Sequence, residues 1–185
     1  MTTTLFTLAE QIRTCTACPL SKERFLAVPG DGLATAKIMF IGEAPGAEED
    51  RQGRSFIGRS GKFLDTLFAN ANIQRKDVFI TGSVKCHPPK NRTPTTLELT
   101  TCKNLWLDSQ IKIIRPKLIV ILGRVALLSL LQEKNIAELQ GKKITRNNQD
   151  YFITYHPSAG MRFPKIKTAM EKDFETIKKL ANSLI

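Results

Sequence analysis

Four short runs of aliphatic and β-branched residues alternate with segments of helical periodicity along the chain. The apolar runs span residues 37–41, 78–80, 118–122 and 151–154. The helical patterns span residues 61–71, 97–114, 124–132 and 168–184. Short continuous apolar runs are typical of strands buried on both faces, and strands that alternate with helices favour a parallel sheet covered on both sides. We therefore expect an α/β fold with three layers, α/β/α, around a four-stranded parallel sheet.

The length of the chain, 185 residues, is that of one ordinary domain. Without internal repeats, it predicts a single domain over residues 1–185. The chain opens with an amphipathic helical pattern and lacks the cationic and apolar segments of a secretory signal. Its most apolar stretch, residues 118–131, is interrupted by Gly123 and Arg124 and is shorter than the roughly 20 residues that span a bilayer. We therefore expect a cytoplasmic protein with no membrane segment, acting as a monomer.

The chain is strongly basic. It has 28 lysines and arginines against 17 aspartates and glutamates, which gives a net charge of +11. Such a charge favours partners that are rich in phosphate. Charge alone does not separate a nucleic-acid binder from another basic soluble protein, so a nucleic-acid partner has to be inferred from particular side chains.

An acidic residue and a histidine follow two of the predicted strands. Glu43 lies in a tight turn after the first strand, residues 42–46, and His156 precedes Pro157 and Ser158 after the last strand. The turn lacks the three glycines of a dinucleotide-binding fingerprint. Because ligands bind beyond the carboxyl ends of parallel strands, Glu43 and His156 are candidates for a hydrolytic pair. The alternative is a carboxylate that caps a helix and a histidine that packs in the interior.

The chain has four cysteines, two of which form a CxxC motif. They are Cys15, Cys18, Cys86 and Cys102. In a reducing compartment, such cysteines are more plausible as metal ligands or buried thiols than as disulfides. Four thiolates bind either zinc or an iron-sulfur cluster, and the spacing does not distinguish the two.

Five motifs, taken in order and with their spacing, resemble those of the family 4 uracil-DNA glycosylases. They are GEAPGAEED at 42–50, GRSFIGRSGKFLD at 53–65, VKCHPPKNRTP at 84–94, IRPKLIVILGRVAL at 114–127 and TYHPSA at 154–159. The resemblance extends from Cys15 to about Arg162. It implies the four-stranded parallel sheet, a structural 4Fe-4S cluster on the four cysteines, and DNA containing uracil as substrate. The implied reaction is hydrolysis of the N-glycosidic bond, which starts base excision repair.

The resemblance also implies roles for individual residues. A base must be flipped out of the duplex and stacked in a pocket before an enzyme can remove it, and Phe56 matches the stacking ring. His156 would donate a hydrogen bond to O2 of the base, and Glu43 would position the attacking water and offset charge on the sugar. Without the flanking motif, Phe56 would be read as a core residue. The expected base-binding residues are Gly42, Ala44, Pro45, Gly46, Phe56, Gly82 and Ser83.

Two further segments resemble DNA-contacting parts of the family. The segment after His156 matches a loop that enters the minor groove, with Met161 as the apolar wedge. Lysines and arginines around residues 85–92 are candidates for phosphate contacts, with a solvated surface as the alternative. The expected DNA-binding residues are Lys85, Lys90, Arg92, Ser158, Met161 and Arg162.

The chain departs from the family pattern at Gly82. Family members usually have an asparagine there, whose amide pairs with uracil and disfavours cytosine. Loss of such a contact removes about 1–3 kcal/mol of discrimination. Three consequences are open: Ser83 or a backbone amide reads uracil, the site accepts another deaminated base such as hypoxanthine or xanthine, or activity is low.

Two other classes of function are compatible with the sequence. One is a catalytically weak or inactive iron-sulfur protein that binds damaged DNA or senses redox state, suggested by Gly82. The other is a nucleic-acid binder that holds zinc on the four cysteines.

Overall fold

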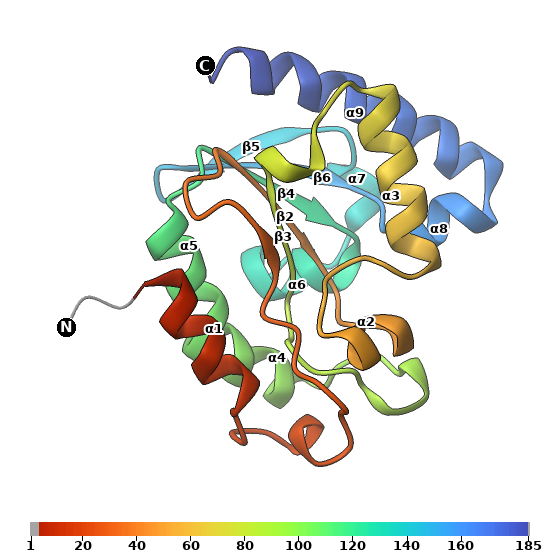
Figure 1. Cartoon of the computed structure of the whole chain (residues 1–185). Coiled ribbons are helices and arrows are strands. Elements are labelled where there is room, and N and C mark those ends of the chain that lie inside the picture. Colours follow the sequence, from red (N-terminus) through yellow and green to blue (C-terminus); the bar gives the residue numbers. More distant parts are fainter. Residues whose placement is uncertain (1–3, 185) are drawn as a thin grey trace.

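Four parallel strands form the centre of a mixed six-stranded sheet in the computed structural model, which describes residues 4–184 (Figure 1). They are β2 (Ile38–Gly42), β3 (Phe79–Gly82), β4 (Leu118–Leu122) and β6 (Gln149–Thr154). The strand order is β1-β3-β2-β4-β6-β5, with all contacts among the four central strands parallel. The predicted parallel core is therefore confirmed.

The two edge strands were missing from the sequence prediction, which gave a sheet of four strands. β1 (Asp31–Gly32) pairs antiparallel with β3, and β5 (Lys143–Arg146) pairs antiparallel with β6. Both lack an apolar run. β1 has only two residues, and β5 exposes most of its length to solvent, so neither gives the pattern of a buried strand.

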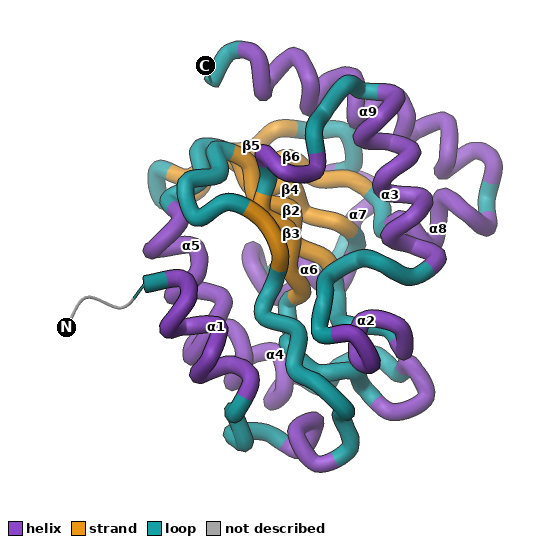
Figure 2. Tube along the Cα trace, viewed as in Figure 1, coloured by secondary structure: helices purple, strands orange, loops and turns teal. Residues whose placement is uncertain are grey.

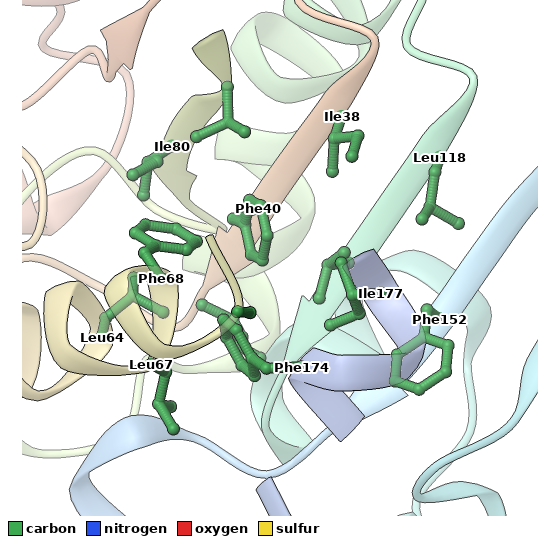
Figure 3. Packing of buried hydrophobic residues seen from close by; sticks show 14 of the residues in the cluster. Ile38, Phe40, Leu64, Leu67, Phe68, Ile80, Leu118, Phe152, Phe174 and Ile177 are labelled. Carbon is green, nitrogen blue, oxygen red and sulfur yellow. The ribbon is translucent and has the colours of Figure 1, made fainter. Parts of the chain in front are cut away.

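Neighbouring residues of the central strands point to opposite faces of the sheet. On one face, Phe40 of β2 lies 4.9 Å from Phe68, centroid to centroid, and 6.0 Å from Phe174. These two rings belong to α3 (Arg59–Asn70) and α9 (Pro164–Asn182), which cover this face (Figure 3). The shorter α8 (Pro157–Arg162) contacts both helices.

The opposite face packs against α5 (Asp108–Ile114) and α6 (Arg124–Leu131) through alternate strand residues such as Ile121. α1 (Leu5–Arg13) lies against α5 (Figure 2). The sheet therefore lies between two helical layers, as the sequence predicts.

The helix predicted at 97–114 is divided in three. α4 (Thr96–Cys102) and α5 are joined by a π-helical turn, Lys103–Leu107. The remaining α-helices are α2 (Ala47–Gln52) and α7 (Ile136–Leu139), and 3-10 turns occupy Pro19–Lys22, Arg75–Asp77 and Pro89–Asn91. Within residues 4–184, no helix has the length and apolar character needed to cross a membrane.

The carboxyl ends of the central strands lie level with one another. Gly42 of β2 is in register with Gly82 of β3, and Leu122 of β4 with Thr154 of β6. Glu43 and His156 lie just after two of these ends, so the topology brings them to the same edge of the sheet.

Candidate active site

A cavity of about 570 Å³ opens at the carboxyl edge of the sheet. This volume is within the range of small-molecule sites, about 300–1,000 Å³. The predicted site residues that line it are Glu43, Ala44, Pro45, Gly46, Phe56, Gly82, Arg92, His156, Ser158, Met161 and Arg162. Residues that are far apart in the sequence thus converge, as expected from the strand ends.

Gly42 lies next to the rings of Phe56 and His156, which both line this cavity. A Cβ atom at Gly42 would lie 2.5 Å from Cζ of Phe56 and 3.7 Å from Nε2 of His156. The first distance is far inside van der Waals contact, so the absence of a side chain at Gly42 makes room for the Phe56 ring.

The hydrogen bonds of His156 fix the position of its ring proton. The backbone N–H of Ser158 donates to Nδ1 at 3.2 Å, and the Ser158 hydroxyl lies 2.8 Å from the same nitrogen. Because Nδ1 accepts, the neutral ring carries its proton on Nε2. Burial lowers the pKa of His156 to about 4, partly offset by the negative charge of Glu49. At neutral pH the imidazole is therefore uncharged, with its Nε2–H on the side of Gly42 and Phe56.

Glu43 is partly buried in the turn that follows β2. Burial raises the pKa of its carboxyl group, and the nearby Arg124 guanidinium partly offsets this. Arg124 is the first residue of α6, directly after the end of β4. It is a cation near Glu43 and was not among the predicted site residues.

Glu49 is a buried carboxylate that joins two walls of the cavity. Its Oε1 accepts hydrogen bonds from the N–H groups of Ile57 at 2.8 Å and Gly58 at 2.7 Å, while Oε2 accepts from Gly46 N–H at 3.1 Å. One side chain therefore fastens the turn after Glu43 to the segment after Phe56. Glu49 was not among the predicted site residues, although its place three residues after the N-cap Gly46 is the spacing of a capping box.

Phe56 adopts a left-handed backbone conformation, with φ of 51°. For a residue with a side chain, this conformation is held by its surroundings. A Cβ at Gly61 would lie 1.9 Å from the Phe56 carbonyl oxygen, so only glycine fits beneath that turn. On the other side, Arg75 donates to the Ser55 carbonyl at 2.6 Å.

Ser83 does not line the cavity. Its side chain is buried and its hydroxyl donates to the Gly42 carbonyl at 2.8 Å. The expectation that the Ser83 side chain reads the base is therefore wrong, because the hydroxyl is committed to holding β2 and β3 together. Gly82 does line the cavity, and a Cβ there would lie 2.7 Å from the Val84 carbonyl oxygen.

Lys85 is also placed differently from the prediction. Its side chain is only 1% exposed, and Nζ donates to Thr81 Oγ1 at 2.7 Å and to the Gly82 carbonyl at 2.8 Å. A phosphate contact at the surface is excluded by this burial. Burial lowers the pKa of Lys85 to about 8.

The other expected DNA-binding residues lie at or near the cavity rim. Lys90 is exposed in the loop after β3, and Arg92 gives two hydrogen bonds to Glu98, at 2.7 and 2.8 Å. Met161 is 38% exposed, and Phe163, which the sequence analysis overlooked, is 55% exposed. Two large apolar side chains therefore face solvent within three residues.

The four cysteines line a second, small cavity, between α1, α4 and the segment after β3. Trp106 Nε1–H donates to Cys15 Sγ at 3.2 Å, and Arg24 Nη1 donates to Cys86 Sγ at 3.0 Å. Among residues 4–184, no three Cys, His, Asp or Glu side chains converge as they would around one metal ion. The thiols share a cavity without meeting at a point, and burial raises the pKa of Cys102 to about 12.

Comparison with known proteins shows the superfamily to which the chain belongs. The model of the uracil DNA glycosylase superfamily matches residues 29–180. A type-4 uracil-DNA glycosylase of Saccharolobus solfataricus is 42% identical over 95% of this chain and 86% of its own length. Proteins of the same name from Sulfurisphaera tokodaii and Thermotoga maritima are 41% and 42% identical, over 94% and 84% of this chain and 83% and 82% of their own.

Proposed function

Because this chain belongs to the uracil DNA glycosylase superfamily, we propose that it removes uracil from DNA by hydrolysing the N-glycosidic bond, the first step of base excision repair. The observation that carries the proposal is the cavity in which Phe56, Glu43 and a neutral His156 lie together at one edge of the sheet. The activity makes the protein a hydrolase of N-glycosyl bonds.

The cavity supplies what a flipped base requires. The base leaves the duplex and stacks on the Phe56 ring. Bond cleavage places negative charge on the departing pyrimidine, and His156 Nε2–H donates to its O2. A neutral imidazole suits this task. It donates a hydrogen bond to the anion, and no positive charge remains buried in the cavity after the base has left.

Glu43 acts on the sugar side of the bond. As a carboxylate, it orients the attacking water and offsets the positive charge that develops on the sugar. Gly42 and the backbone of Ala44, Pro45 and Gly46 shape the wall around the base. All of these groups come from one chain, which supports action as a monomer.

The exposed rim provides the proposed contacts to DNA. Met161 is the wedge that fills the space of the flipped base, and Ser158, Arg162, Lys90 and Arg92 contact the backbone. Arg92 does so with a guanidinium already paired to Glu98, so it contributes less than a free arginine.

The base preference is proposed to be broader than uracil. Gly82 puts no side chain into the cavity, and the neighbouring Ser83 hydroxyl is occupied. With no amide to read the base edge, recognition depends on backbone groups and on stacking, so hypoxanthine and xanthine are further candidate substrates.

The four cysteines fit a 4Fe-4S cluster better than zinc. Four sulfurs bound to one zinc ion at about 2.3 Å must converge closely, whereas each cysteine of a cluster binds a different iron. The thiols share a cavity without converging, which favours the cluster. When bound, the cluster would crosslink the segment after α1, the end of α4 and the segment after β3. The expected observation is a brown protein that loses its colour when Cys15, Cys18, Cys86 or Cys102 is replaced by alanine.

An oligonucleotide panel tests the activity. Duplexes and single strands with one uracil, hypoxanthine or xanthine are incubated with the purified protein, and alkali-labile abasic sites are measured. Product from the uracil strand supports the proposal, and absence of product from every strand contradicts it. Tight binding to uracil-containing DNA without product would instead support a damage-binding protein without turnover, which the absent side chain at Gly82 makes the second candidate.

A further inference from the structure

Lys85 is a buried cation without a carboxylate partner. Its side chain is 1% exposed, and its two hydrogen bonds go to a hydroxyl and a carbonyl, Thr81 Oγ1 and Gly82 O. Among the described residues, no aspartate or glutamate forms an ion pair with it within 4.0 Å. A buried ammonium in this setting is costly unless negative charge lies nearby.

The cysteine cavity would place negative charge beside Lys85 once its thiolates hold a cluster. Lys85 lines this cavity together with Arg24 and the four cysteines. An oxidised 4Fe-4S core with four thiolates carries a net charge of about −2. Lys85 and Arg24 would supply two positive charges, which balance it.

Lys85 also holds the wall of the base cavity. Nζ fixes the carbonyl of Gly82, and the Lys85 backbone carbonyl accepts a hydrogen bond from Val28 N–H at 2.7 Å. Gly82 and Val28 both line the base cavity. Lys85 therefore lines the cysteine cavity and is hydrogen-bonded to two residues that line the base cavity.

We propose that Lys85 is a positioning residue that links the cluster to the base cavity: its ammonium is a counter-ion of the thiolate-bound cluster and fixes the Gly82 carbonyl beside the flipped base. The inference rests on the proposed cluster and glycosylase activity. It gives the cluster a part in shaping the base cavity, through charge and a hydrogen bond, with no electron transfer in the reaction.

The test compares Lys85→Met with wild type and with Lys172→Met. Methionine keeps much of the length of lysine and removes the charge, while Lys172 is exposed on α9, away from both cavities, and loses the same charge. Iron per chain, the reduction potential of the cluster by film voltammetry, and kcat and KM on a uracil oligonucleotide are measured for each.

Lys85→Met should lower the reduction potential, because removing a positive charge favours the oxidised cluster. It should also lower kcat about tenfold with little change in KM, since the hydrogen bond it loses holds the base wall and not the DNA backbone. Lys172→Met should match wild type in all measurements. An unchanged potential in Lys85→Met overturns the counter-ion role, and an unchanged kcat overturns the link to the base cavity.

Thr81→Val keeps the inference testable if Lys85→Met fails to fold. Thr81 Oγ1 is one of the two acceptors that hold Nζ against the Gly82 carbonyl, so valine loosens that contact while it keeps the ammonium beside the thiols. The potential should then stay at the wild-type value while kcat falls, and wild-type kcat in this variant overturns the link. If wild type itself lacks iron or makes no abasic sites, the proposed function fails; if wild type passes both and the variants match it, only the role of Lys85 fails.

Discussion

The phenyl ring of Phe56 lies 5.9 Å from the imidazole of His156, centroid to centroid, with 39° between the ring planes. The two rings come from the segment before α3 and the segment after β6, which are about a hundred residues apart in the chain. One offers a stacking face and the other a hydrogen-bond donor. Their separation depends on Gly42, which adds no side chain between them and the sheet.

Gly42→Ala should displace the Phe56 ring and slow base removal. The new methyl group would lie 2.5 Å from Phe56 Cζ, so the ring must move. We expect kcat to fall at least tenfold on a uracil oligonucleotide, with iron content unchanged because the cysteine cavity is separate. Single-turnover kinetics and iron analysis measure both. Wild-type kcat would show that the ring position is not important for the reaction.

His156→Ala should lower the rate of base release about 10²–10³-fold, the usual loss for one donor to a developing anion. DNA binding and colour should stay unchanged. Ser158→Ala is the matched control, because it removes the hydroxyl near Nδ1 and leaves the backbone N–H that fixes the ring tautomer. Its rate should fall less than tenfold. If both variants lose the same amount, the donor role of Nε2 is contradicted.

His156 should also make folding stability depend on pH. Its folded pKa of about 4 lies below the ordinary value of 6.5, so the unfolded chain binds a proton first as the pH falls. The stability from this group is complete above about pH 6.5 and decreases towards pH 4, by about 3 kcal/mol. Urea unfolding of wild type and His156→Asn at several pH values measures the difference. Parallel curves for the two proteins would contradict the depressed pKa.

Glu49→Gln should slow base removal more than it weakens DNA binding. Three backbone N–H groups donate to the Glu49 carboxylate. In glutamine, the side-chain NH2 group cannot accept from an N–H, so at least one of these hydrogen bonds is lost and the contact between the Glu43 turn and the Phe56 segment loosens. We expect a loss of about 1–3 kcal/mol in stability and about tenfold in kcat.

Asp173→Asn is the control for Glu49→Gln. Asp173 is another buried carboxylate, bound to Thr154 and Gln140, and it does not line the base cavity. It should lose comparable stability while kcat is retained. If kcat falls equally in both variants, Glu49 has only a general structural role.

Gly82→Asn tests the origin of base preference. The asparagine amide should raise the rate on uracil relative to hypoxanthine about tenfold or more. Gly82→Ala is the control, because its Cβ meets the same Val84 carbonyl at 2.7 Å without bringing an amide. Both variants should lose thermal stability. An equal ratio of uracil to hypoxanthine rates in the Gly82→Asn and Gly82→Ala variants would contradict recognition by the amide.

The parallel core was predictable because buried strands leave a direct record in sequence. β4 was predicted with its observed bounds, since each of its five residues is apolar and buried. β5 was not, because its side chains are polar and its pairing is decided by β6 in space. The π-helical turn between α4 and α5 likewise leaves no signal in the periodicity.

Site residues that directly follow the strands could be predicted from the sequence. Residues whose role depends on whether the side chain is buried could not. Glu43 and His156 follow strands, and the structure places both at one cavity. Lys85 was assigned to the surface because lysines are seldom buried, and its inward direction depends on how the chain turns after β3. Glu49 was overlooked because its partners, the backbone N–H groups of Ile57 and Gly58, are invisible in a sequence.

The polar edge of the sheet has a consequence for how the protein behaves when it is concentrated. An unpaired strand edge invites another molecule to add a strand, which leads to aggregation. β5 occupies one edge with Lys143 and Arg146, whose charges pair with Asp150 and Glu133. A neighbouring molecule would have to disrupt these ion pairs to dock there. The charged side chains of β5 therefore protect this edge of the sheet and disfavour its extension into fibrils by strands of other molecules.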